Sequence, residues 1–184
     1  MTDRKTETRA DYRHTLAIPV RWMDCDAYGH VNNAIYYAMM DQVVTVYIVE
    51  TGVIAMGTSP SIGLCVSSAC DFHQPIEFPE VVDARLRIAR LGDKSVRYEV
   101  GLFRAGEDHP ASTGHFVHVY VDRTTRRPIS LTPEQRAALA PLIVWQPCLD
   151  RQRAVRPPRQ VDGRRRVSGQ LTTCGPDTYG VITA

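Results

Sequence analysis

The chain has 184 residues, of which 43% are hydrophobic and 23% are charged, and its formal net charge at pH 7 is +2. This composition is typical of one ordinary globular domain and excludes fibrous and generally disordered proteins. No apolar run approaches the roughly 18 residues of a membrane helix, and the start is too polar for a signal peptide, so we expect a cytoplasmic protein without membrane insertion.

The N-terminal part predicts a short lead-in followed by a strand. Residues 1–13 are polar and aperiodic, and we interpret them as a disordered lead-in. Apolar side chains then alternate with others from Leu16 and Ile18 to Trp22, which is the pattern of a half-buried strand. Pro19 cannot donate a hydrogen bond to a neighbouring strand, so we expect this strand at a sheet edge.

A long helix is predicted next. Asn32 and Asn33 suit a helix N-cap, and apolar residues recur at three- and four-residue spacing from Ile35 to Tyr47. Gly52 stands where a C-cap glycine belongs. Because the second half of this segment is rich in β-branched residues, we expect the helix to be central and buried, with a sheet wrapped around it.

Several strand-like segments follow, with no second strong helix between them. They span residues 62–78, 81–91, 94–103 and 113–122. The first favours one long, bent strand, whereas the others alternate as half-solvated strands do, with Asp83, Arg85 and Arg87 on a solvent face. The short connections indicate an antiparallel meander.

The C-terminal part predicts a short helix and then a tail. Residues 132–142 begin with Thr132 as N-cap and Pro133 at the first helical position, and we expect the folded domain to span 14–145. The segment 146–184 is rich in arginine and proline, and we interpret it as a flexible, solvated tail, with docking to an acidic partner as the alternative.

Charge is distributed unevenly along the chain. Residues 151–184 hold seven arginines and two aspartates, a net charge of +5, so the other 150 residues carry −3. A mildly acidic body lacks the basic face that nucleic-acid-binding domains present. We therefore expect no nucleic-acid partner.

Cysteines and histidines do not indicate a metal site. The chain has five scattered cysteines: Cys25, Cys65, Cys70, Cys148 and Cys174. None forms a CxxC pair, so we expect reduced thiols. His115 and His118 are three apart on a strand and point to opposite faces, and Cys65 and Cys70, five apart, do the same if their strand is regular. We expect no metal and no cofactor.

The most informative stretch is RWMDCDAYGHVNNAIYY, which begins at Arg21. It places two carboxylates, a glycine, a histidine and two asparagines in the loop that enters the long helix. Free backbone N–H groups and the positive end of the helix dipole meet there, so the place favours developing negative charge. A carboxylate beside free amides offers a base or nucleophile and oxyanion donors, which ester or thioester hydrolysis needs.

Through these residues the chain resembles the hotdog-fold acyl-CoA thioesterases, and in particular the 4-hydroxybenzoyl-CoA thioesterase-like family. The shared motif is D-x-D-x-x-G-H-V-N-N-x-x-Y, present here from Asp24 to Tyr36. The order of strand, motif loop, long helix and four strands is similar too. The resemblance covers about residues 14–145 and implies an α+β hotdog fold, in which an antiparallel β-sheet wraps around a long central α-helix.

The resemblance also implies roles for individual residues. Asp26 matches the catalytic carboxylate, which attacks the thioester carbonyl or activates a water. The backbone N–H of Asn33 matches the amide that polarises the carbonyl, and His30 matches a histidine that orients the substrate or the water. Lys94 and Ser95 are similar to a pair that approaches the coenzyme A phosphates. The substrate-binding set is Tyr28, Gly29, Tyr36, Asp41, Lys94 and Ser95.

Some of these residues also have structural interpretations. We expect Asp24 to brace the loop by accepting backbone N–H bonds, and the side chains of Asn32 and Asn33 to cap the helix. Asp41 lies in an apolar part of the helix. Because a buried carboxylate is costly, we expect Asp41 to be either paired or part of the site.

The function that the resemblance implies is hydrolysis of an acyl-CoA thioester to free acid and coenzyme A. It implies a homodimer or a dimer of dimers with the site between subunits, and no cofactor. Two alternatives stay open. One is a hotdog hydratase or dehydratase acting on acyl thioesters, and the other is a non-catalytic acyl-CoA-binding protein.

Overall fold

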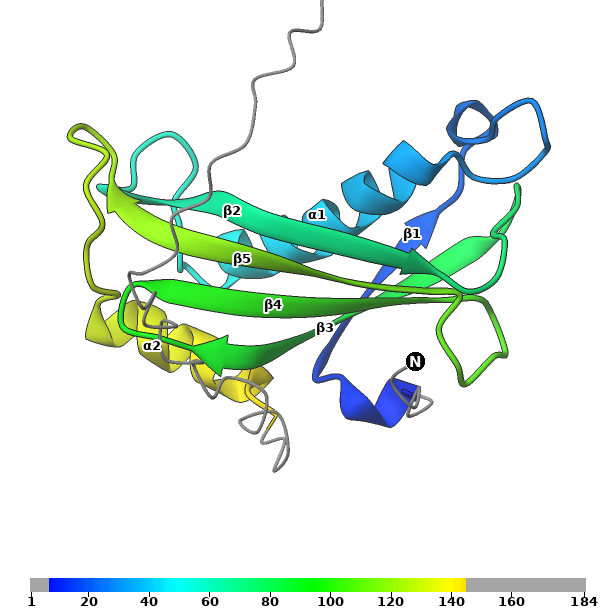
Figure 1. Cartoon of the computed structure of the whole chain (residues 1–184). Coiled ribbons are helices and arrows are strands. Elements are labelled where there is room, and N and C mark those ends of the chain that lie inside the picture. Colours follow the sequence, from blue (N-terminus) through cyan, green and yellow to red (C-terminus); the bar gives the residue numbers. More distant parts are fainter. Residues whose placement is uncertain (1–6, 145–184) are drawn as a thin grey trace, which may run out of the picture. The chain divides into compact units, whose positions relative to one another are not determined.

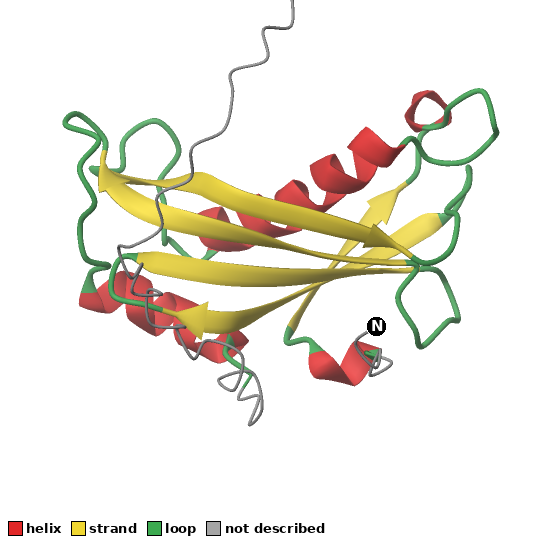
Figure 2. Ribbon diagram, viewed as in Figure 1, coloured by secondary structure: helices red, strands yellow, loops and turns green. Residues whose placement is uncertain are grey.

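Alternating apolar residues build one five-stranded antiparallel sheet, and a long helix lies across one of its faces (Figures 1 and 2). The computed structural model describes residues 7–144. The strands are β1 (His14–Pro19), β2 (Ser61–Phe72), β3 (Val81–Leu91), β4 (Ser95–Phe103) and β5 (Ser112–Asp122). The helices are α1 (Asn33–Glu50) and α2 (Pro133–Leu139), and the 3-10 turns are Arg9–Asp11, Trp22–Asp24 and Ala140–Leu142.

The strand order β1-β3-β4-β5-β2 places β1 and β2 at the two edges. The edge position of β1 confirms the expectation from Pro19, whose missing N–H costs nothing on an unpaired side. The strand ends at Pro19, however, earlier than the alternation predicted. The chain then turns through the Trp22–Asp24 3-10 helix, which leaves the Trp22 side chain 79% exposed.

Strand β2 is bent by a bulge, as its length suggested. The register against β5 shifts between Cys65 and Ser67, so one extra residue enters β2. The extra residue reverses the alternation, and Cys65 and Cys70 therefore lie opposite His118 and Gly114 on the same face of the sheet. This corrects the expectation of opposite faces, which assumed a regular strand.

Helix α1 begins where the two asparagines predicted. The Asn32 side chain accepts a hydrogen bond from the Ala34 N–H at 3.0 Å and caps the helix. The helix packs on β1, β3 and β4 through fully buried residues that include Met40, Val43 and Val44. A long helix over an antiparallel sheet is the α+β hotdog arrangement, so the expected fold class is confirmed.

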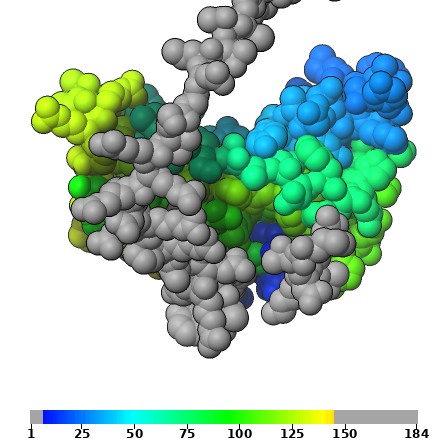
Figure 3. Space-filling view, viewed as in Figure 1, coloured from blue at the N-terminus to red at the C-terminus, as the bar shows by residue number. Residues whose placement is uncertain are grey.

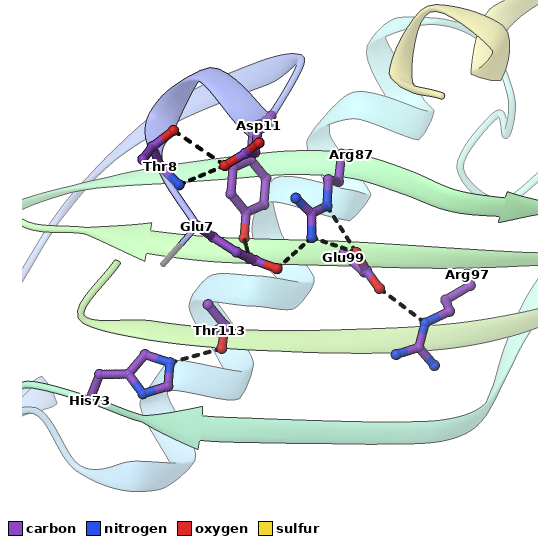
Figure 4. Close-up of polar contacts among 9 residues, drawn as sticks. Glu7, Thr8, Asp11, His73, Arg87, Arg97, Glu99 and Thr113 are labelled. Atoms are coloured by element: carbon purple, nitrogen blue, oxygen red, sulfur yellow. Dashed lines mark hydrogen bonds and ion pairs between the residues drawn. The ribbon is translucent and has the colours of Figure 1, made fainter. Parts of the chain in front are cut away.

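The N-terminal segment is more ordered than its polar sequence suggested. Residues 7–13 fold over the outer face of the sheet, where Tyr12 is buried and its hydroxyl donates to Glu7 at 2.6 Å. Arg87 is only 3% exposed and forms ion pairs with Glu7 at 2.6 Å and Glu99 at 2.8 Å (Figure 4). The expected solvent-facing position of Arg87 is therefore wrong, because this segment covers it.

The C-terminal helix of the domain begins where the sequence predicted. Helix α2 begins at Pro133 after the Thr132 cap. Neither α1 nor α2 combines the length and the apolar composition that would carry a helix through a bilayer. Residues 1–6 and 145–184, which include the arginine-rich and proline-rich tail, lie outside the described residues.

Candidate active site

The loop between the Trp22–Asp24 turn and α1 is braced by Asp24. The Asp24 carboxylate is buried and accepts hydrogen bonds from the backbone N–H of Arg21 at 2.8 Å and from its Nη2 at 2.7 Å. The Arg21 guanidinium holds the pKa of Asp24 below its usual range, because it hydrogen-bonds to the ionised form. The Asp24 carbonyl also accepts from the Asn32 N–H at 2.9 Å. Asp24 thus has the bracing geometry that we expected.

Asp26 lies on a tight turn two residues further on. Its Oδ1 accepts from the Tyr28 N–H at 2.8 Å, and its own N–H donates to the His30 carbonyl at 2.9 Å. Gly29 closes the turn with φ at +84°, a conformation that favours glycine. Within the described part of the chain, Asp26 Oδ2 has no hydrogen-bond partner. The turn therefore presents one carboxylate oxygen for chemistry and brings Asp26 close to His30.

The start of α1 offers a backbone donor next to this turn. The Asn32 side chain accepts a hydrogen bond from the Ala34 N–H, and the Asn32 carbonyl accepts one from the Ile35 N–H. No acceptor for the Asn33 N–H is found among residues 7–144. A free N–H at the positive end of an 18-residue helix is a suitable donor for an oxyanion.

These groups open onto one groove of about 490 Å³. Its lining residues are Asp26, His30, Val31, Asn33, Tyr36, Phe72, His73, Gln74 and Pro75. The motif loop and the segment that follows β2 form its two walls, and they lie side by side in the space-filling view, in blue and blue-green (Figure 3). The structure thus brings together four residues that the sequence singled out, namely Asp26, His30, Asn33 and Tyr36.

The second wall is held in place by the core. His73 and Gln74 both donate their backbone N–H groups to the carbonyl of Ala111, at 2.8 and 3.0 Å. The Tyr36 hydroxyl accepts from the Ile76 N–H at 3.2 Å, and burial raises the pKa of this tyrosine, so it stays neutral. The Tyr36 hydroxyl thus anchors the wall.

Sequence reasoning missed this second wall, because residues 62–78 were interpreted as one continuous strand. Strand β2 ends at Phe72, and the chain leaves the sheet over His73 and Gln74 before Pro75. The proline was the available signal, since it cannot donate to a ladder. The ring of Phe72, which ends the strand, meets the Tyr36 ring edge-to-face at 5.0 Å.

Other predicted site residues do not reach this groove within one chain. Tyr28 is 85% exposed and lies outside the lining, and Gly29 serves the turn. Asp41 is exposed, which corrects the expectation of burial. The residues that α1 buries, among them Met40, Val43 and Val44, occupy other positions of the helix.

Lys94 and Ser95 lie at the opposite end of the sheet from the groove. Ser95 pairs with Val119 of β5, whereas Phe72, at the groove, pairs with Ser112 of the same strand. Seven residues of extended chain separate these two positions, a distance of about 23 Å. Within one chain the lysine-serine pair therefore lies far from Asp26.

Comparisons with known proteins agree with this fold. A family model described as the thioesterase-like superfamily matches residues 20–139. The crystal structure of the PA5185 protein from Pseudomonas aeruginosa is 44% identical, with a TM-score of 0.72, and the match covers 74% of this chain and 96% of that one. The PA2801 protein of the same organism is 31% identical, with a TM-score of 0.64, over 69% of this chain and 98% of that one.

A more distant structure shares the fold. The BH1999 gentisyl-coenzyme A thioesterase is 24% identical, with a TM-score of 0.61, over 68% of this chain and 99% of that one. None of the curated proteins compared with the chain matches it. The molecule is a hotdog-fold protein of the thioesterase class. The chain belongs to the thioesterase-like superfamily, and this membership supports thioester hydrolysis as its general activity.

Proposed function

We propose that the protein hydrolyses an acyl-CoA thioester to the free acid and coenzyme A. The observation that carries this proposal is that Asp26, His30 and Asn33, whose N–H has no acceptor among residues 7–144, line one groove. A carboxylate and an oxyanion donor that face the same space are the minimum that acyl transfer to water requires.

In the proposed reaction the thioester carbonyl oxygen accepts a hydrogen bond from the Asn33 N–H, and the dipole of α1 stabilises the charge that develops on it. Asp26 either attacks the carbonyl carbon and forms an anhydride that water then hydrolyses, or removes a proton from a water that attacks directly. In both routes the C–S bond breaks, the coenzyme A sulfur leaves as a thiolate and takes up a proton, and water supplies the new oxygen of the acid. His30 orients the substrate or the water.

The acyl group would lie along the aromatic wall of the groove. Tyr36 and Phe72 meet edge-to-face there, and Phe72 is half exposed although it is apolar. An aromatic ring or an alkyl chain bound against these side chains would remove apolar surface from water. The wall therefore supports an acyl group that is apolar next to the carbonyl.

The proposed working form is a homodimer, or a dimer of such dimers, with the site between subunits. The separation of about 23 Å between Lys94 and the groove supports it, because a second copy can supply the lysine-serine pair that lies far from the groove in one chain. Strand β2 supports it as well. It is a 12-residue edge strand on which Leu64 and Val66 are exposed, and such edges invite pairing with another chain. In the dimer, Tyr28 and Asp41 would complete the substrate site.

Thiol release tests the proposal. We would follow it with a thiol-reactive dye over acetyl, short-chain, long-chain, benzoyl and phenylacetyl coenzyme A thioesters, for the wild type, Asp26→Asn and the control Asp108→Asn. Asp108 is an exposed carboxylate outside the groove lining. We expect Asp26→Asn to lower the rate by about 10² to 10⁴ and the control to leave it unchanged.

Three results would contradict this assignment. Turnover of Asp26→Asn near the wild-type rate would remove Asp26 from the mechanism. A folded protein that releases no thiol but hydrates crotonyl-CoA would be a hydratase, and one that binds acyl-CoA without either reaction would be a non-catalytic binder.

A further inference from the structure

A second carboxylate lies beside His30, on the segment that follows the groove's second wall. The Glu77 Oε1 is 3.6 Å from the His30 Nε2, and the two residues face each other in an isolated antiparallel β-bridge. Residues directly opposite in such a bridge hold their Cβ atoms about 4.5–5.5 Å apart. The backbone thus sets the two side chains next to each other.

The core fixes the position of Glu77 from both sides. On one side Ile76 is fully buried, its carbonyl accepts from the Val31 N–H at 2.8 Å, and its N–H donates to Tyr36. On the other side the Glu77 N–H donates to Glu80 at 3.3 Å.

Glu80 is itself held by an ion pair. Its two carboxylate oxygens accept from Nε and Nη2 of Arg104, at 2.8 and 2.9 Å, just after β4. The segment 76–80 is therefore fastened to the motif loop, to α1 and to the end of β4. The backbone of Glu77 is accordingly held beside His30 by the fold, although the Glu77 side chain is half exposed.

We propose that Glu77 is a positioning residue that accepts the Nε2–H of His30 and so fixes the tautomer and the orientation of this imidazole. The proposal rests on the hydrolysis proposed above. A neutral imidazole has one donor and one acceptor nitrogen, so an Nε2–H directed at Glu77 leaves Nδ1 as the acceptor. His30 Nδ1 then accepts a hydrogen bond from the attacking water and directs a water lone pair toward the thioester carbon.

The length and the exposure of the contact agree with orientation as its role. A separation of 3.6 Å is longer than a hydrogen bond, and catalytic contacts in unliganded sites are often long and tighten only when substrate binds. Both side chains are about half exposed, and exposed pairs of this kind contribute little to stability. Removing Glu77 should therefore change the rate of the reaction more than the stability of the fold.

A double-mutant cycle tests the role in catalysis. We would measure kcat and KM for the wild type, Glu77→Gln, His30→Asn and the double variant, on the acyl-CoA that the wild type hydrolyses fastest. We expect Glu77→Gln to lower kcat on the order of 10-fold with KM little changed, and to have no further effect once His30 is replaced. Equal losses in both backgrounds would show that Glu77 does not act through His30.

The control and the stability check use the same assay. Glu107→Gln removes another carboxylate near Arg104, 3.6 Å from its guanidinium, and should leave kcat unchanged. All variants should melt within a few degrees of the wild type. If His30→Asn fails to fold, His30→Gln takes its place in the cycle.

Long-range proton–nitrogen NMR tests the geometry without relying on turnover. In spectra recorded at about pH 8, the wild type should show neutral imidazole tautomers with the His30 proton on Nε2, and Glu77→Gln should show a mixture of both tautomers. Loss of the His30 signals in His30→Asn assigns them. An unchanged tautomer in Glu77→Gln would overturn the role of Glu77, whereas absence of hydrolysis by the wild type would overturn the proposed function instead.

Discussion

Two aspartates of the motif, only two residues apart, are placed in different environments. Asp24 is buried and its carboxylate is satisfied by the backbone and side chain of Arg21. Asp26 keeps one oxygen without a partner among residues 7–144 and faces the groove. The sequence alone favoured bracing for Asp24 and chemistry for Asp26, and the geometry of the two carboxylates supports this division.

The environment of Asp24 predicts an acid dependence of stability. Hydrogen bonds from Arg21 lower the folded-state pKa, so the ionised carboxylate stabilises the fold. This contribution is fully present above about pH 4, the usual value in an unfolded chain, and is lost as the pH falls through the lower folded-state pKa. At pH 7, Asp24→Asn should lower the free energy of unfolding by about 1–3 kcal/mol.

Urea unfolding at pH 7 and at pH 3 measures both effects. The difference between the wild type and Asp24→Asn should shrink at the lower pH. Asp108→Asn, which changes an exposed carboxylate, serves as the control. A difference that is the same at both pH values would contradict the assignment of this acid dependence to Asp24.

At the scale of elements, the N-terminal segment is a structural part of the sheet's outer face. The Tyr12 ring meets Phe103 edge-to-face at 5.6 Å and lies under the Arg87 guanidinium at 4.8 Å. Strand β4 leaves room for it with Gly101, where an added Cβ would lie 2.8 Å from the Cζ and the hydroxyl oxygen of Tyr12. The missing side chain of Gly101 thus makes space for Tyr12, which lies 89 positions earlier in the chain.

We expect Tyr12→Ala to lower the free energy of unfolding by about 3–5 kcal/mol, because it leaves a cavity and exposes Arg87. Tyr28→Ala removes the same side chain at an exposed position and should change stability by less than about 0.5 kcal/mol. Thermal and urea unfolding of both variants measure the difference. Equal free energies of unfolding for the two variants would show that residues 7–13 do not stabilise the fold.

At the scale of the whole molecule, the two sheet edges differ. Strand β1 is short and carries Pro19, which protects an edge from further pairing, whereas β2 is long and exposes apolar side chains. The β2 edge is therefore where we propose that a second copy binds.

The oligomeric state of a charged variant tests this interface. Val66 is 60% exposed on β2, and Val66→Lys should convert the proposed dimer to a monomer, because lysine opposes edge pairing. Val81→Lys makes the same change at the start of β3, beside the other edge, and should leave the dimer intact. Light scattering after size-exclusion chromatography gives the masses. A monomeric wild type would exclude the homodimer, and a dimeric Val66→Lys would place the interface elsewhere.

The sequence by itself determined the order of the elements, the edge position of β1, the start of α1 at Asn32 and Asn33 and the loop that carries Asp26. These features follow from local rules, namely the period of apolar residues, the missing donor of proline and the capping of helix ends.

Only the tertiary structure decided the burial of Arg87, the exposure of Asp41, the second wall of the groove and the place of Glu77 beside His30. Each depends on contacts between segments far apart in the chain. A bulge in β2, for example, changes which side chains share a face of the sheet, and the alternation of residues along the strand does not reveal it.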